Sequence, residues 1–201
     1  MAAIKRGHEV TFNAKQADVV FVSEDTPTDA NGVRDLQPIY ELIDVARGIG
    51  KPIVLTSQVP PGFTRALGID KIHHQAETLR IKDSEERAYS PDYIAVGGNE
   101  SQWHPTYVKY LYSFGCPVLP MSFESAEMTK IAVNMMLAAQ VDMTNKLAAA
   151  AAKVGADWYR VKHALALDKR IGPHAYTTPG RWQDSLHLLR DHVTLEAIST
   201  P

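Results

Sequence analysis

Lys130 and Asn134 stand four residues apart in residues 122–154, a run that contains neither glycine nor proline. The run is rich in alanine, leucine, methionine and lysine, which predicts a long helix. Side chains at this spacing lie on one helix face, one turn apart. An ammonium and a carboxamide aimed at one oxygen would stabilise an alkoxide or hemiacetal anion, or order a water molecule. The alternative is a lysine that extends from an amphipathic helix to solvent beside an ordinary polar neighbour.

The expected helix has recognisable ends. Ser122 can cap its first turn, where Glu124 and Glu127 suit the helix dipole, and Gly155 is a natural C-cap. Roughly thirty residues make a helix of about 45 Å, which is longer than one small core requires. The length therefore predicts a link between two domains or a dimer seam. A second helix is expected over residues 157–167, with an aspartate as its cap.

The first half of the chain alternates strand and helix patterns. Short runs rich in β-branched and aromatic residues predict strands at 17–23, 52–56, 93–96 and 117–120. Apolar residues at helical spacing predict helices at 36–49 and 104–114. This order favours an α/β fold with a parallel sheet and helices on both faces.

The length, charge and cysteine content of the chain exclude several classes of protein. A chain of 201 residues allows one or two domains, and the formal net charge of −2 gives no basic surplus for nucleic acid. The alanine run at 147–152 is too short to span a bilayer, and charges within residues 1–10 argue against a signal peptide, so a cytoplasmic location is expected. The single Cys116 excludes an internal disulfide and a multi-cysteine zinc site, and the histidine spacing predicts no metal site.

Five segments stand in order along nearly the whole chain: 17–29 (ADVVFVSEDTPTD), 56–65 (TSQVPPGFTR), 77–98 (ETLRIKDSEERAYSPDYIAVGG), 125–134 (SAEMTKIAVN) and 168–172 (DKRIG), the last followed by Pro179 and Gly180. Each is weak alone, but together they resemble the UDP-glucose/GDP-mannose dehydrogenase family. The resemblance implies an incomplete Rossmann-like parallel sheet in a partial NAD-binding domain, residues 1–121. A helical central domain for dimerisation and catalysis would follow at 122–201.

The family implies NAD-dependent oxidation of the C6 alcohol of a nucleotide sugar, in polysaccharide biosynthesis, by a homodimer joined through the long helix. Lys130 and Asn134 would stabilise the oxyanion, while Glu77 and Asp191 would handle water and protons. The resemblance assigns the cofactor contacts to Thr26, Pro27, Ser57, Gln58 and Val59, and the substrate contacts to Leu79, Arg170 and Gly180.

Three of these roles have plain structural alternatives. Glu77 is equally consistent with a solvated loop residue, and Thr26 with a hydroxyl that caps a turn. Arg170 has the guanidinium that suits sugar or phosphate oxygens, but a surface ion pair would explain it as well.

The pattern departs from the family at its nucleophilic cysteine. Counting from Pro179, that position holds His187, within residues 184–191 (DSLHLLRD), and Asp191 matches the family aspartate. A cysteine thiolate captures the aldehyde and permits a second oxidation, which imidazole does poorly. Either His187 acts as a general base beside Asp191, in an enzyme that stops after one oxidation or hydrates the aldehyde without binding it covalently, or it is a polar surface residue in a protein that has lost the second step. Cys116 lies in a strand-like context before the helix and does not take this role.

A second departure concerns the cofactor. Residues 5–11 (KRGHEVT) resemble the end of the family's first helix and the start of its second strand, but no G-x-G-x-x-G turn precedes them. The acid expected to hold the ribose and the C-terminal UDP-binding domain are also missing from the pattern. The expectation is a cofactor crevice without its pyrophosphate-binding turn.

Two other functions remain open at this point. A β-hydroxyacid dehydrogenase also joins a Rossmann domain to a long helix with lysine and asparagine, although residues 56–65 and the ETLR segment argue against it. The non-enzymatic alternative is a binding or oligomerising remnant with the long helix as its dimer seam.

Overall fold

The computed structural model describes residues 2–77 and 84–200, and the chain forms two compact units. Unit 1 comprises Met1–Pro27 and Arg34–Lys130, and unit 2 comprises Thr28–Val33 and Ile131–Pro201. The expected functional division into residues 1–121 and 122–201 stays a prediction. Within the described residues, no helix combines the length and apolar character needed to cross a bilayer.

Unit 1 is built on a five-stranded sheet in the order β1-β2-β3-β4-β5. Its strands are β1 (Val20–Val22), β2 (Ile53–Leu55), β3 (Ile72–Ala76), β4 (Ile94–Gly97) and β5 (Val118–Met121). Neighbouring strands pair in parallel except β3 and β4, which are antiparallel. The predicted α/β class with a Rossmann-like, mostly parallel sheet and a long helix is therefore confirmed, and the pair of β3 with β4 is its one antiparallel exception among the described strands.

The strand register decides where the connecting loops leave the sheet. Val22, Leu55, His74, Gly97 and Met121 form one row across the five strands. β1 and β2 end at this row from one direction, and β4 and β5 end at it from the other. The loops that follow these four strands consequently start from the same row. The beginning of α6 (Phe123–Lys153) contacts the end of the loop after β2 through Glu127, which accepts the Gly62 and Thr64 N–H groups.

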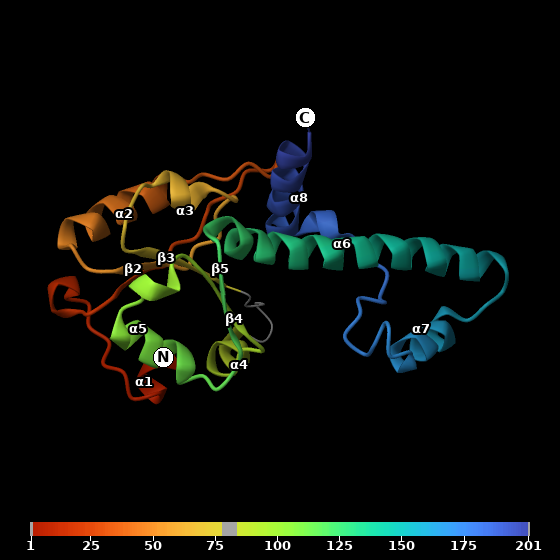
Figure 1. The fold of residues 1–201 in the computed structure, drawn as a ribbon. Helices are drawn as coiled ribbons and strands as arrows, with labels where there is room; N and C mark the ends of the chain where they lie inside the picture. Colours follow the sequence, from red (N-terminus) through yellow and green to blue (C-terminus); the bar gives the residue numbers. More distant parts are fainter. Residues whose placement is uncertain (1, 78–83, 201) are drawn as a thin grey trace. The chain divides into compact units, whose positions relative to one another are not determined.

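Helices cover both faces of the sheet (Figure 1). α2 (Gln37–Ile49) and α3 (Phe63–Ala66) pack on one face, where Ile53 and Leu55 of β2 point. α5 (Pro105–Tyr112) packs on the other face against Val54, because successive strand residues alternate sides. The remaining elements of unit 1 are α1 (Ala2–Lys5), α4 (Ser84–Tyr89) and the 3₁₀ turns Ala14–Gln16 and Glu100–Gln102.

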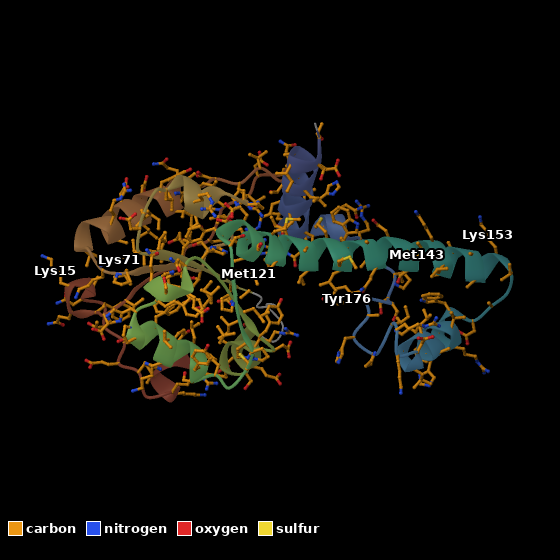
Figure 2. The ribbon with its side chains drawn as sticks, viewed as in Figure 1. Lys15, Lys71, Met121, Met143, Lys153 and Tyr176 are labelled. Carbon is orange, nitrogen blue, oxygen red and sulfur yellow. The ribbon has the colours of Figure 1, made fainter. Side chains whose placement is uncertain are left out.

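Unit 2 is helical and follows the rest of α6. Its other helices are α7 (Trp158–Leu167), α8 (Leu186–Ser199) and the 3₁₀ turn Trp182–Asp184. Hydrogen bonds tie the loop after α7 to α6: the Thr144 hydroxyl donates to the Tyr176 carbonyl at 2.8 Å, and the Tyr176 N–H donates to Gln140 Oε1 at 2.8 Å. Figure 2 accordingly shows Tyr176 beside the stretch of α6 that carries Met143.

The predicted helix ends are confirmed by their capping contacts. The Ser122 hydroxyl accepts the Ser125 N–H at 3.1 Å at the start of α6, and the Asp157 carboxylate accepts the Tyr159 N–H at 2.9 Å at the start of α7. Gly155 closes α6 with a φ of 72°, the left-handed conformation that glycine adopts without a Cβ clash.

Gly97 lies against the first turn of α6, and its replacement by alanine is expected to destabilise unit 1. A Cβ there would lie 2.9 Å from both Ala126 Cβ and Phe123 Cα, and backbone atoms cannot move aside as a flexible side chain can. We expect a loss of about 1–3 kcal/mol in the free energy of unfolding, measured by urea denaturation. Gly48→Ala is the matched control. Gly48 lies inside α2 with no atom near its missing Cβ, so alanine there should stabilise by up to about 1 kcal/mol. Equal effects of the two changes would contradict the assigned contact.

Candidate functional site

The loops after β1 and β2 in unit 1 carry the residues predicted to contact the cofactor. The Glu24 N–H donates to the Ser57 hydroxyl at 2.9 Å, and the buried Thr26 hydroxyl lies 3.4 Å from the Gln58 carbonyl, to which it donates. The carboxyl ends of two adjacent parallel strands are thus joined side by side, the place where open α/β sheets bind ligands. Of the other two predicted residues, Pro27 is exposed, whereas the Val59 side chain is fully buried in the core and serves packing.

Glu77 directly follows β3, and its side chain is exposed. Burial raises the pKa of Tyr110 on α5, and the Glu77 carboxylate raises it further, which places this acid within electrostatic reach of α5. The role of Glu77 as a proton acceptor stays a prediction. Leu79, the predicted substrate contact, lies outside the described residues.

Glu127 was expected only to favour the helix dipole, and its observed contacts are more specific. Its carboxylate is buried and accepts the Gly62 N–H at 2.5 Å and the Thr64 N–H at 2.8 Å. Burial raises the pKa of this carboxyl, while the side chain and N–H of Thr64 and the N–H of Gly62 act in the opposite direction. Glu127 therefore joins α6 to the start of α3, a contact over more than sixty residues of sequence that no local pattern reveals.

Lys130 and Asn134 both belong to α6, where their spacing of four residues puts them one turn apart on one face of the helix. The Asn134 side chain is buried in unit 2, and its Nδ2 donates to Asp191 Oδ2 on α8 at 2.6 Å. The structure thus brings together two predicted catalytic residues that are 57 positions apart in the sequence. Asp191 is fully buried, so it holds the Asn134 amide in a fixed orientation.

His187 lies in the first turn of α8, four residues before Asp191. The histidine is exposed, whereas Asp191 and the neighbouring Arg190 are buried. One helical turn separates His187 from Asp191, as the sequence led us to expect. An exposed imidazole is accessible to a small substrate, and the role of His187 in catalysis stays a prediction.

The predicted sugar contacts Arg170 and Gly180 are held by other groups of unit 2. Arg170 makes a two-point ion pair with Asp168, Nη2 to Oδ2 at 2.7 Å and Nε to Oδ1 at 3.0 Å, and it is exposed. Gly180 is tied to α6 by both groups of the Asn145 amide, which accepts the Gly180 N–H at 3.0 Å and donates to the Gly180 carbonyl at 2.8 Å. A substrate role for Arg170 would require it to exchange or share its partner.

Sequence comparison finds the same family that the five segments indicate. Residues 124–185 match the central domain of the UDP-glucose/GDP-mannose dehydrogenase family. The chain is 30% identical over 172 residues to a UDP-glucose 6-dehydrogenase of Rickettsia bellii, covering 79% of this chain and 40% of that protein. It is also 30% identical over 194 residues to UDP-glucose 6-dehydrogenase 1 of Arabidopsis thaliana, covering 82% of this chain and 39% of that protein.

Structural comparison extends the similarity to nearly all of the chain. A solved UDP-glucose dehydrogenase from Pyrobaculum islandicum superposes with a TM-score of 0.72 at 27% identity, covering 96% of this chain and 51% of that one. The chain spans about 40% of the length of the curated relatives named above. Activity, substrate and assembly of the whole protein are therefore matters of proposal.

Proposed function

This chain belongs to the UDP-glucose/GDP-mannose dehydrogenase family, and from that premise we propose that it oxidises the C6 alcohol of a nucleotide sugar with NAD as the hydride acceptor. Support comes from the family match over the helix of Lys130 and Asn134 and from the similarity over most of the chain. A cytoplasmic location and a role in polysaccharide biosynthesis stay predictions from the sequence.

The contact between Asn134 and Asp191 carries the proposal. Asp191 accepts one N–H of the Asn134 amide, and a carboxamide has a second N–H that can donate to a substrate oxygen. Lys130, one turn earlier on α6, would add a positive charge to the same developing alkoxide. Preorganised donors of this kind act without reorganisation at the moment of reaction, which makes them effective in a buried setting.

The loops after β1 and β2 are the groups of this chain that fit the cofactor. The Ser57 hydroxyl accepts from the Glu24 N–H and keeps its own proton for donation, and the Thr26 oxygen can accept a hydrogen bond. When bound, NAD would take the hydride that leaves C6. These loops are the part of a cofactor site that the described residues of unit 1 supply.

The test is NAD reduction by the purified chain with UDP-glucose and, separately, with small β-hydroxyacids, together with calorimetry of NAD binding. Turnover with the nucleotide sugar alone supports the proposal. Turnover with the hydroxyacids alone would replace it with the related dehydrogenase activity. An intact, folded preparation that binds no NAD would favour the binding or oligomerising role instead.

The histidine at position 187, where the family has a cysteine, determines which reaction product we expect. We expect the wild-type chain to release the aldehyde, with one NADH formed per sugar, because imidazole does not capture the aldehyde as a thiolate does. In His187→Cys the thiolate adds to the aldehyde, a second hydride leaves the thiohemiacetal, and water releases the acid from the resulting thioester. Two NADH per sugar are then expected, as measured by product chromatography and NADH yield. His187→Ser is the control and should stay at one. Two NADH per sugar in the wild type would contradict this assignment.

The part of α6 in unit 2 also supports a homodimer. Its exposed apolar side chains recur at intervals of three, four or seven residues, as in a coiled-coil seam. They are Val133, Met136, Met143 and Leu147, and the exposed Val154 follows directly after the helix. We expect sedimentation equilibrium to give twice the chain mass, and Met143→Glu to shift the equilibrium to monomer by placing a charge in the seam. A wild-type monomer at all concentrations would exclude this seam.

A further inference from the structure

The buried carboxylate of Glu127 has no part in the chemistry proposed above, yet it holds two backbone amides of another element. It is 1% exposed and accepts the N–H groups of Gly62 and Thr64. Hydrogen bonds to an ionised acceptor are roughly twice as strong as those between neutral groups. Removing this acceptor would leave two N–H groups at the start of α3 without a partner, one of them in a buried position.

A second acid lies one turn earlier on α6 and contacts the same short helix. Glu124 pairs with Arg65 of α3, Nη2 to Oε2 at 3.0 Å, and both side chains lie at the surface. Exposed ion pairs contribute little to stability because solvent and salt screen them. The two acids can therefore be compared directly. Both are glutamates of α6 that contact α3, and they differ in that Glu127 is buried and Glu124 lies at the surface.

The position of Glu127 makes it more than an ordinary tertiary contact. Lys130 follows three residues later on α6, on a neighbouring position of the same face. Gly62 ends the loop that starts with Ser57 and Gln58, which are joined to the loop after β1. A single carboxylate thus connects the turn that carries Lys130 with the loops that carry the predicted cofactor contacts.

The start of α6 also has contacts with the sheet that do not involve Glu127. Ala126 and Phe123 touch the sheet at Gly97, and Ala126 is fully buried. The helix is therefore anchored without Glu127, so we expect a change of the carboxylate to act mainly on the loop over residues 57–62, although Val59 within this loop packs in the core. A shift of about 1 Å between reacting groups can cost roughly 100-fold in rate.

We propose that Glu127 is a positioning residue that keeps the loop of Ser57 and Gln58 aligned with Lys130. The inference rests on the proposed function, since it gives this alignment its purpose. It assigns Glu127 no contact with substrate or cofactor, and its effect passes through the Gly62 and Thr64 amides.

The test compares Glu127→Gln with Glu124→Gln in the full chain, by amide hydrogen exchange and by steady-state kinetics with NAD and UDP-glucose. Glutamine keeps the size of the side chain but loses one acceptor oxygen and the charge. In Glu127→Gln we expect exchange at Gly62 and Thr64 to rise roughly 10-fold or more and kcat to fall roughly 10- to 100-fold, with little change in KM for the sugar. Glu124→Gln should stay within about twofold of wild type in both measurements. Glu127→Asp, which keeps the charge, serves as the second variant if the Glu127→Gln protein does not fold.

Three results would overturn the inference, and they differ from one another. Unchanged exchange at Gly62 and Thr64 would show that the carboxylate does not hold the loop. Faster exchange with kcat equal to that of Glu124→Gln would reduce Glu127 to a structural contact and leave the proposed function intact. A wild-type chain without turnover would refute the proposed function and the positioning role with it, while the exchange rates would still measure the contact itself.

Discussion

Replacing Lys130 with alanine is expected to lower kcat for nucleotide-sugar oxidation by about 100- to 1,000-fold, the loss typical of removing one donor from an oxyanion site. The ammonium acts on charge that develops only as the alcohol proton and hydride leave, so KM for the sugar should change much less than kcat. The measurement is initial-rate NADH formation at saturating NAD with UDP-glucose varied.

Two further variants make the result specific to the position of this charge. Lys146→Ala removes an exposed lysine from the same helix and should leave kcat within about twofold. Lys130→Arg keeps the charge but changes its shape and reach, so it should restore only part of the rate. A Lys130→Ala enzyme that works as well as Lys146→Ala would remove Lys130 from the mechanism and leave the family assignment standing.

The long helices could be predicted closely because their signals are local. Helix formers without glycine or proline gave α6, and Ser122, Asp157 and Gly155 marked helix ends that the structure places within a residue or two. Capping depends on side chains within a few positions of the helix end, so the local sequence is enough to predict where a helix begins and ends.

β3 was not predicted, because its sequence IHHQA carries polar residues where a buried strand usually carries apolar ones. Both histidines of β3 are nevertheless buried, and the antiparallel pairing of β3 with β4 depends on neighbours that the sequence does not show. Val59 shows another limit of the sequence. The family resemblance predicts a cofactor contact, which stays a prediction, but it did not reveal that the Val59 side chain completes the core beneath α2 and α3.

The candidate site was predictable only where the family resemblance reached it. Asn134 and Asp191 meet as expected of two site residues, although no spacing rule connects positions on separate helices. Glu127 was visible as an acid in the first turn of α6, but its contacts with Gly62 and Thr64 join positions more than sixty residues apart in the sequence. Contacts of this kind depend on the tertiary fold, and no local pattern of residues predicts them.

The two histidines of β3 should make the protein unusually sensitive to acid. His73 stacks on Tyr107 with ring centroids 5.7 Å apart, and neither of its ring nitrogens has a hydrogen-bond partner in the described part of the chain. His74 faces the opposite side of the sheet with a similarly unpartnered Nδ1. Burial lowers the pKa of each histidine from 6.5 to about 4.

A lowered histidine pKa means that folding favours the neutral ring. Above about pH 6.5 the ring is neutral in both the folded and unfolded chain, and the full stability is present. As the pH falls from about 6.5 to about 4, the unfolded chain takes up protons that the folded chain refuses, and stability is lost. A shift of this size corresponds to about 3 kcal/mol for each histidine, against a total of about 5–15 kcal/mol for a typical domain. Urea denaturation at a series of pH values should therefore show unit 1 losing much of its stability over this interval.

Variants that remove the titrating rings isolate this effect from other acid-sensitive groups. His73→Phe keeps a flat ring against Tyr107, and His74→Leu places an apolar side chain on the other face of the sheet. Each variant should reduce the loss of stability between about pH 6.5 and about pH 4, even if it lowers the stability at neutral pH. His163→Gln removes an exposed histidine of α7 and should leave the slope as it is in wild type. Since burial without a partner is the physical cause, a double variant of His73 and His74 with the same slope as wild type would show that both rings find water or another acceptor in solution.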